Sequence, residues 1–447
     1  MADNVKAFLI DLLSSIQAGK IYPPMHPGFQ EYVQKSYQSL RDILSLRPEL
    51  TIGIVAGELA CGEEIFFDLS RKLRPLLLYL GERGIERIWF HQKVRREELA
   101  KFVSLLALPK KRLKLETQEA LIQAGIQTIR AGKITAPDSG DVRTRAEGGG
   151  EKASEKEAEQ PPEAIRESGD FSARDAAGIL DRLLSNEKIA LLDLKFNVLN
   201  LLEHFSGRQH KLAEFVPAER RNLSLVVHLL GTSLLSMSFS SGLGYSREDV
   251  AEIGIAALLH DIGRLAAGSR QGAEVSTDHS LLGGLILLEQ AETLGLLPAV
   301  VAAEHHRRSD LKDEERPLAV GLHPVSLLVA ICNHYETLIR KGFESADFSP
   351  VQAYEQMREV RGTVFSPELL DEFFRLMGAW PVGTPVVLSD GRVAVVRKAD
   401  SRDPFRPRVE VVYPDEQREW ITLADRPEDL RIERVLNPFG EGKSYLG

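Results

Sequence analysis

Histidines and one aspartate recur inside apolar segments in the middle of this chain. His260 and Asp261 stand side by side at the end of the apolar run Ala256–Leu259, just before Gly263 and Arg264. Other histidines interrupt apolar runs on both sides of this pair: His228, His279, His305 and His306. A single histidine in such a pattern is usually a satisfied core residue. Burying this many unpaired groups would cost several kcal/mol in total. A shared metal ion would remove much of this free-energy cost, because imidazole and carboxylate are ligands of divalent metals.

The adjacent pair limits where such an ion could lie. Neighbouring residues on a helix point about 100° apart, so His260 and Asp261 cannot both bind one ion from the middle of a helix. At a helix end that faces a cavity, they can share a site with ligands from other helices. We therefore expect an apolar helix that ends near Gly263, with the remaining ligands supplied from other helices.

The elements that must position these residues are helices. Helical periodicity extends almost throughout residues 171–377, with Gly and Pro at most breaks. The main predicted helices are Ala190–His204, Leu223–Phe239, Val250–Leu259, Ser280–Ala291, Ala299–His306, Leu318–Arg340, Ser349–Val360 and Pro367–Leu376. This region should hold the largest core of the protein.

The flanking regions have different patterns. Residues 1–133 mix helical and strand periods, including a predicted closing helix at Thr117–Ala131, and indicate a small α+β domain with a regulatory or partner-binding role. Residues 134–170 hold Gly148–Gly150, Pro161–Pro162 and few apolar residues, which predicts a disordered linker. Residues 378–447 change to period two around a turn at Ser389–Gly391, which predicts a small β-barrel-like extension.

Composition narrows the class of protein. The 447 residues carry a formal net charge of −9, which argues against a broad nucleic-acid-binding surface. Two cysteines, Cys61 and Cys332, exclude a cysteine-rich framework and fit a reducing cytoplasm. The N-terminus does not look like a basic signal peptide, and we expect no membrane-spanning segment.

The order of the ligand candidates resembles a known family. The series His, His-Asp, His, His-His and a later polar position is similar to the HD superfamily of metal-dependent phosphohydrolases. The doubled His305–His306 resembles its HD-GYP branch of cyclic di-GMP phosphodiesterases. The resemblance covers roughly residues 175–440, and it rests on the segments Ala257–Arg264, His279 with Gly283, Ala330–Leu338, Gly362–Leu370 and Pro381–Thr384.

This resemblance implies a mainly α protein with an HD-type helical bundle. It implies a phosphodiesterase or phosphohydrolase that hydrolyses cyclic di-GMP or a related nucleotide with a metal-activated water. Two divalent ions, iron or manganese, would be bridged by Asp261. Arg264, where the family usually has Lys, would bind a phosphate oxygen. The first ion would be held by His228, His260, Asp261 and Asn333, and the second by Asp261, His279, His305 and His306.

Two departures from the family pattern leave an alternative open. Asn333 stands where the family has Asp, and the loop Arg307–Pro317 lacks the family's Gly-Tyr-Pro sequence and keeps only a Pro. Arg307 and Arg308 could be a solvated helix end or a phosphate clamp that replaces this loop. The alternative function is a signalling module that binds a nucleotide or a partner protein without turnover. We expect a bacterial, cytoplasmic signalling protein whose residues 1–133 could contact a signalling partner, and the sequence is compatible with a homodimer.

Overall fold

In this computed structural model the chain divides into two compact units, Met1–Ser168 and Gly169–Gly447. The structure describes residues 2–132 and 178–446, except for 56–57, 62–63, 67–68, 71–72, 82, 109–116, 186, 188–190, 209–210, 213–222, 269–278, 307–320, 344–347 and 414–417. The linker predicted at 134–170 lies outside the described residues. The domain boundaries at 133, 170 and 377 stay predictions.

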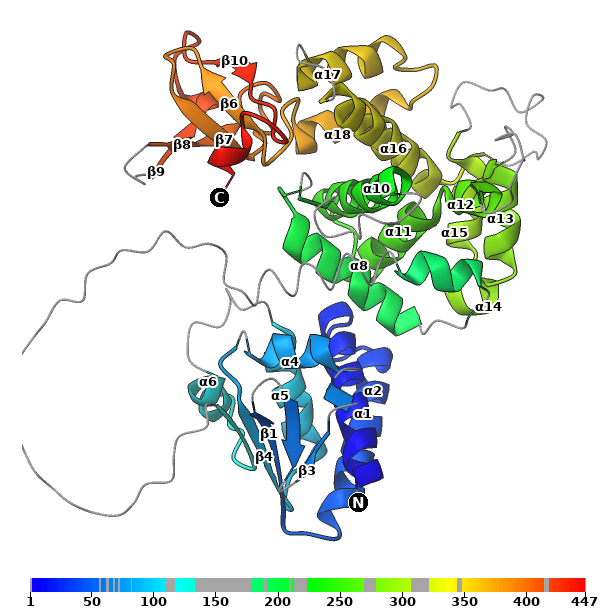
Figure 1. Ribbon diagram of the computed structural model, residues 1–447, viewed down its shortest axis with the longest axis vertical. Helices are drawn as coiled ribbons and strands as arrows, with labels where there is room; N and C mark the ends of the chain where they lie inside the picture. The colour runs from blue at the N-terminus through cyan, green and yellow to red at the C-terminus, as the bar shows by residue number, and fades with distance from the viewer. Residues whose placement is uncertain are drawn as a thin grey trace, which may run out of the picture. The chain divides into compact units, whose positions relative to one another are not determined.

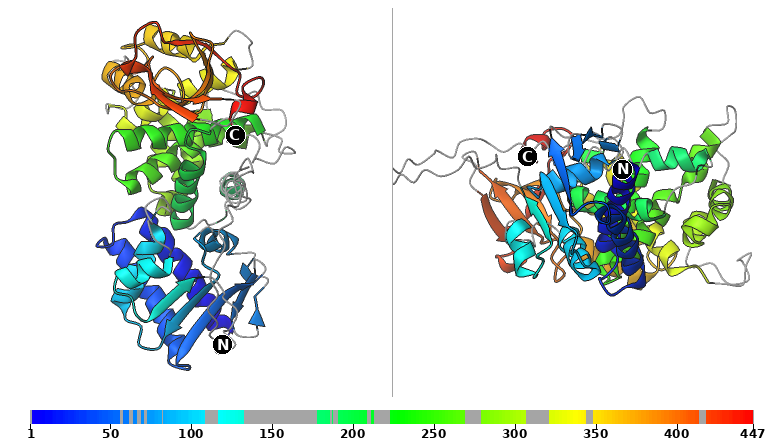
Figure 2. Two further views of the ribbon diagram at one scale, coloured as in Figure 1. Left: turned by 90° about the vertical axis from the view of Figure 1, so that its left-hand side faces the viewer. Right: turned by 90° about the horizontal axis from the view of Figure 1, so that it is seen from below.

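The first unit is a five-stranded antiparallel sheet with its longest helices packed on one face (Figures 1 and 2). The strands, in the order β3-β2-β1-β4-β5, are β1 (Glu49–Val55), β2 (Glu58–Cys61), β3 (Glu64–Ile65), β4 (Arg87–His91) and β5 (Ile129–Gly132). The helices are α1 (Ala2–Ile21), α2 (Pro27–Leu44), α4 (Arg74–Gly81), α5 (Arg96–Ala107) and α6 (Thr117–Gln123).

The core of this unit follows from the two periods of the sequence. Ile88 and Phe90 on β4 are both buried. Alternate residues of a strand face the same side, so both side chains lie on the face of the sheet that the helices cover. Phe90 packs edge-to-face against Phe8 of α1 and Phe102 of α5, with ring centroids 5.3 and 5.9 Å apart. Trp89 lies on the opposite, outer face of the sheet.

The helix predicted at Thr117–Ala131 is wrong in its second half. The helix α6 ends at Gln123, and Ile129–Gly132 forms the edge strand β5, which pairs with β4. Gly125 has a φ of 72°, a left-handed conformation that glycine adopts without steric cost and that ends the helix. The buried Ile129 and Ala131 then follow the period of a strand.

Helices make up most of the second unit. They are α8 (Leu191–Phe205), α10 (Leu223–Gly242), α11 (Arg247–Leu259), α12 (Ile262–Gly268), α13 (His279–Leu288), α14 (Ala291–Leu294), α15 (Leu297–Glu304), α16 (Pro324–Gly342), α17 (Pro350–Glu359) and α18 (Pro367–Met377). The central helix is α10, which packs against α8, α11 and α16 (Figure 1).

The sequence analysis expected no membrane-spanning segment, and α10 is a helix that bears on this expectation. Leu223–Gly242 is long and apolar enough to cross a bilayer by length and composition. However, 72% of the qualifying window is buried inside the unit, which is the pattern of a core helix. It also carries the buried His228.

An antiparallel sheet follows the helices. Its strands, in the order β10-β6-β7-β8-β9, are β6 (Pro385–Leu388), β7 (Val393–Lys398), β8 (Arg408–Val412), β9 (Arg418–Thr422) and β10 (Ile432–Val435). Gly391, with a φ of 86°, lies in the turn of the predicted β6–β7 hairpin. The fold class is therefore as predicted: mainly helical, with a small α+β part before the helices and a β-rich extension after them.

Candidate metal centre

The turn between α11 and α12 presents His260 and Asp261 to the interior. His260 is fully buried and Asp261 is 1% exposed. The helix α11 ends at Leu259, as in the predicted helix Val250–Leu259, and α12 begins at Ile262, so the break falls at the pair itself. Adjacent ligands can therefore share one site, because they lie between helices and not within one.

Gly263 has a different function from the predicted helix break. A Cβ at this position would lie 2.0 Å from the carbonyl oxygen of His279 and 2.8 Å from the backbone nitrogen of Gly283. The absence of a side chain lets α12 approach the start of α13 closely. This approach places His279, the first residue of α13, beside Asp261.

His260 and His305 are oriented in the same way. Nδ1 of His260 donates to the carbonyl of Ala257 at 2.7 Å, and Nδ1 of His305 donates to the carbonyl of Ala302 at 2.9 Å. A carbonyl can only accept, so the proton of each neutral ring is on Nδ1 and the lone pair is on Nε2. Both Nε2 atoms are buried and make no hydrogen bond with the described residues. Such backbone bonds hold metal-binding imidazoles in the required tautomer.

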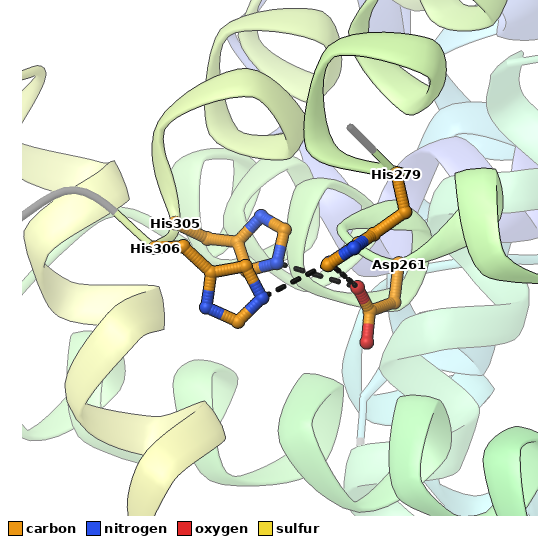
Figure 3. Close-up of side chains that lie close together, drawn as sticks. All are labelled: Asp261, His279, His305 and His306. Atoms are coloured by element: carbon orange, nitrogen blue, oxygen red, sulfur yellow. Dashed lines mark hydrogen bonds and ion pairs between the residues drawn. The ribbon is translucent and has the colours of Figure 1, made fainter. Parts of the chain in front are cut away.

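Asp261 lies at the centre of the histidines. Its Oδ1 is 3.1 Å from Nε2 of His279 and 3.3 Å from Nε2 of His305 (Figure 3). Nε2 of His306 lies 3.0 Å from Nε2 of His279, so ring nitrogens from α13 and the end of α15 converge on this oxygen (Figure 3). On the other side, Oδ2 of Asp261 is 3.7 Å from Nε2 of His260.

Asp261 therefore belongs to two groups of ligand atoms. The first cluster is His228, His260 and Asp261, and the second cluster is Asp261, His279, His305 and His306. Within each cluster, one ligand atom per residue lies within 4.8 Å of the others. Imidazole nitrogens with a carboxylate are a donor set for divalent transition metals. The unpaired Nε2 atoms and Oδ1 of Asp261, which has no hydrogen-bond partner among the described residues, fit such ions.

The protonation states agree with this interpretation. Burial keeps the pKa of His260 well below its usual value, and burial with the neighbouring His305 lowers the pKa of His306 to about 4. Burial alone would raise the pKa of Asp261. The neighbouring His305, His260 and Arg264 outweigh burial and hold that pKa below its usual range. Neutral imidazoles and an ionised carboxylate are the forms that bind metal.

The His228 ring is held by a residue that the sequence analysis did not single out. Its Nδ1 hydrogen-bonds to Oε2 of Glu336 on α16, and both side chains are almost buried. Gly231 on α10 makes room for Glu336, because a Cβ there would lie 3.1 Å from its Cγ. Arg340 lies 3.2 Å from the other carboxylate oxygen. The bond engages Nδ1 and leaves Nε2 of His228 for a cation.

A cavity of about 610 Å³ lies beside both clusters. Its lining includes His228, Asp261, His305, His306 and Asn333. His260 and His279 are not among its lining residues. Asn333 is half-buried, and its side chain makes no hydrogen bond within the part of the chain that the structure describes. The cavity is also lined by the cations Arg264, Arg340 and Lys341 and by the exposed His334, which belongs to neither cluster.

The other histidines have local partners. His26 and His323 cap the N-termini of α2 and α16, and Nδ1 of His91 accepts from the backbone of Lys93. Nδ1 of His204 contacts the carbonyl of Asn200. The remaining candidates, His210, Arg307 and Arg308, lie outside the described residues.

Glu336 could have been found from the sequence. It is an acidic residue inside the apolar pattern of a predicted helix, three positions after Asn333 and so on nearly the same face. No comparable local signal marks Gly263, whose importance depends on which helix packs against it.

The part of the chain that holds these residues matches a known family. Residues 225–338 match the HD domain family. The chain is similar to a cyclic di-GMP phosphodiesterase of Pseudomonas aeruginosa, with 27% identity over 199 residues, 42% of this chain and 47% of the relative. It is also similar to a cyclic di-GMP phosphodiesterase of Thermotoga maritima, with 26% identity over 195 residues, 41% of this chain and 50% of the relative. The chain thus spans about half the length of these relatives.

A solved structure of an HDG"Y"P protein from Bdellovibrio bacteriovorus shares 12% identity, with a TM-score of 0.30, and covers 47% of this chain and 70% of that one. The family match confirms the predicted HD-type domain. An HD domain binds divalent metal, in agreement with the two clusters.

Proposed function

Residues 225–338 form an HD domain, and on that premise we propose that the protein is a metal-dependent phosphodiesterase that hydrolyses cyclic di-GMP or a related nucleotide. The observation that carries the proposal is the position of Asp261, whose carboxylate belongs to both the first and the second cluster. The activity named for the two relatives supports the same reaction.

We assign two divalent ions, iron or manganese, to the two clusters. The first ion would be held by His228, His260 and Asp261, with Asn333 facing it from α16. The second would be held by Asp261, His279, His305 and His306. When bound, such a pair of ions lowers the pKa of a water molecule and stabilises the charge that develops on a phosphodiester.

The residues of the chain would bind and orient the substrate. Arg264 lines the cavity, and its Nε is 3.1 Å from Oδ2 of Asp261, so its partly exposed guanidinium can bind a phosphate oxygen next to the clusters. With Arg340 and Lys341 it gives the cavity three cations, which suits a ligand with more than one phosphate. A volume of about 610 Å³ lies within the usual range for small-molecule sites.

Asn333 would weaken the first position relative to the second. An amide oxygen is a neutral ligand, so the first ion receives one negative charge fewer than an aspartate would supply. We therefore expect the second position to fill at lower metal concentration than the first.

The experiment combines metal analysis with a hydrolysis assay. Purified chain, loaded with manganese or iron(II), should retain metal after dialysis and hydrolyse cyclic di-GMP, and Asp261→Ala should lose both properties. The matched control is His334→Gln, which changes a histidine in the same cavity but outside both clusters, and its metal content should equal that of the unaltered chain. Folded protein that binds neither metal would refute the proposal.

We further propose an organisation of four parts: a regulatory domain at 1–133, a linker at 134–170, the catalytic region at 171–377 and an extension at 378–447. Both cysteines are free thiols, which supports a reducing cytoplasm as the location. A signalling partner for residues 1–133 and a homodimer remain parts of this proposal. Limited proteolysis should cut first within 134–170, and light scattering would give the oligomeric state.

A further inference from the structure

The outer face of the sheet in the first unit carries a hollow of about 750 Å³. It is lined from β1, β4 and β5, from the turn before β4, and from α6. Figure 1 locates these elements. The helices α1 and α5 pack on the other face, where Phe8 and Phe102 contact Phe90. The lining includes Arg83, Arg87, Arg130 and Trp89, against one carboxylate, that of Glu49. Its size falls in the range of small-molecule sites.

The hollow results from the pairing of the strands. Trp89 on β4 is in register with Arg130 on β5, and both face outward with Arg87, two residues earlier on β4. Arg87 is in register with Gly53 on β1 and Gly132 on β5, so no side chain flanks it on either neighbouring strand. A Cβ at Gly132 would meet no atom within 4 Å. The face therefore has an aromatic ring at one end and an open floor beside Arg87.

The charges on this face are not balanced. The indole N–H of Trp89 donates to Oε2 of Glu49 at 2.8 Å, which fixes the ring and engages the single carboxylate. The guanidinium carbon of Arg130 lies 5.0 Å from the centre of the Trp89 ring. Within the described residues, neither Arg87 nor Arg130 has a carboxylate within ion-pair distance. The sequence of residues 1–133 as a whole contains 20 Lys and Arg against 15 Asp and Glu, although the whole chain carries −9.

We propose that this hollow binds a nucleotide with at least two phosphates. The base would stack on the Trp89–Arg130 pair, because a planar ring is attracted to both an indole face and a guanidinium plane. The phosphates would lie over the open floor, where Arg87 supplies donors. This site is separate from the metal centre, and its existence does not depend on the proposed phosphodiesterase activity.

Other occupants fit the face less well. A single-stranded nucleic acid is usually bound by several aromatic side chains along a groove, and this hollow offers one indole. An apolar helix would have to bury Arg87 and Arg130 without counter-charges, which is costly. The combination of one aromatic ring, an open floor and excess positive charge matches a small anion with one planar ring.

The test is a titration of the full chain with ATP and with GTP, in which binding is measured by calorimetry and by tryptophan fluorescence. Arg87→Ala should weaken binding at least about tenfold by removing a phosphate donor, and Gly132→Leu should do the same by filling the floor without changing any charge. Trp89→Phe should remove the fluorescence response. The matched control is Arg408→Ala, because Arg408 stacks on Trp420 at 4.6 Å in the sheet of the second unit. It should leave the affinity unchanged.

Four results would overturn the proposal. They are the absence of saturable binding, nucleotide affinity that is unchanged in Arg87→Ala and Gly132→Leu, inorganic triphosphate that binds as tightly as ATP and GTP, and a single-stranded oligonucleotide that binds more tightly than either. The second result would place the nucleotide elsewhere, including at the metal centre, and the third would reduce the hollow to a polyanion patch. Circular dichroism of each variant establishes that it is folded, and Arg87→Ala carries the test if Gly132→Leu does not fold.

Discussion

His228 should lose affinity for a metal ion when Glu336 is replaced. The carboxylate hydrogen-bonds to Nδ1 of His228, and the side chains are 7% and 10% exposed for His228 and Glu336, respectively. A hydrogen bond to a charged group contributes about 1.5–3 kcal/mol. Loss of such an outer partner lowers metal affinity about 10–100-fold, or about 1.4–2.8 kcal/mol, so the two estimates agree.

Two substitutions separate the bond from the charge. Glu336→Gln keeps the size of the side chain and an oxygen that can accept from Nδ1, so it should lose the smaller part of the affinity. Glu336→Ala removes the acceptor and leaves Nδ1 buried, so it should lose the full amount. Glu359, an acid on α17 with an exposed side chain, offers the matched control Glu359→Gln, which should bind metal as the unaltered chain does.

The assay is a competition titration that resolves two binding events. Manganese is added against a chelator of known affinity, and binding is followed by calorimetry with elemental analysis of the product. We expect the weaker event, which we assign to the first cluster, to weaken further in both variants, while the second cluster keeps its affinity. Unchanged binding in a folded Glu336→Ala protein would refute the reasoning. An equal loss at both positions would show that Glu336 supports the fold and not the orientation of His228.

Three further predictions concern the same centre. Gly263→Ala should lower the free energy of unfolding by about 1–3 kcal/mol, measured by urea denaturation, because its Cβ would meet the backbone of His279; an unchanged midpoint would contradict the close approach of the helices. Asn333→Asp should raise manganese affinity at the weaker position at least about tenfold, and a calorimetric titration without any gain would place residue 333 away from the ion. The pKa values of His260 and His306 are lowered in the folded chain, to about 4 for His306. As the pH falls, the unfolded chain therefore binds protons at these histidines before the folded chain does. The metal-free protein should lose stability as the pH falls from about 6.5 towards 4. Urea midpoints at pH 7.5 and 5 test this, with a smaller difference expected for His306→Gln.

The candidate ligands could be picked out from the sequence because each of the histidines carries its own signal. A histidine inside an apolar helical pattern is locally unusual, and His260 beside Asp261 is more so. The family order then gave each one a role that the convergence of Asp261, His279 and His305 supports. Contacts between elements could not be predicted from the sequence. Gly263 was interpreted as a break, but its lack of a Cβ is required because α13 packs against it, and the sequence does not show that contact.

The hollow on the first sheet shows the same limit more strongly. Arg87 and Trp89 lie two residues apart on β4, and residues two apart on a strand share a face. Gly132 could not be added to that face, because residues 117–131 were predicted as one helix and β5 was therefore missing. A strand of four residues has little periodicity of its own, and its position is fixed by pairing with β4 some 40 residues earlier. Sites formed by strand pairing are thus harder to predict from a single sequence than sites formed by ligands on helices. In this hollow the open floor lies at Gly132, and a glycine carries no side chain that would mark the position as part of a site.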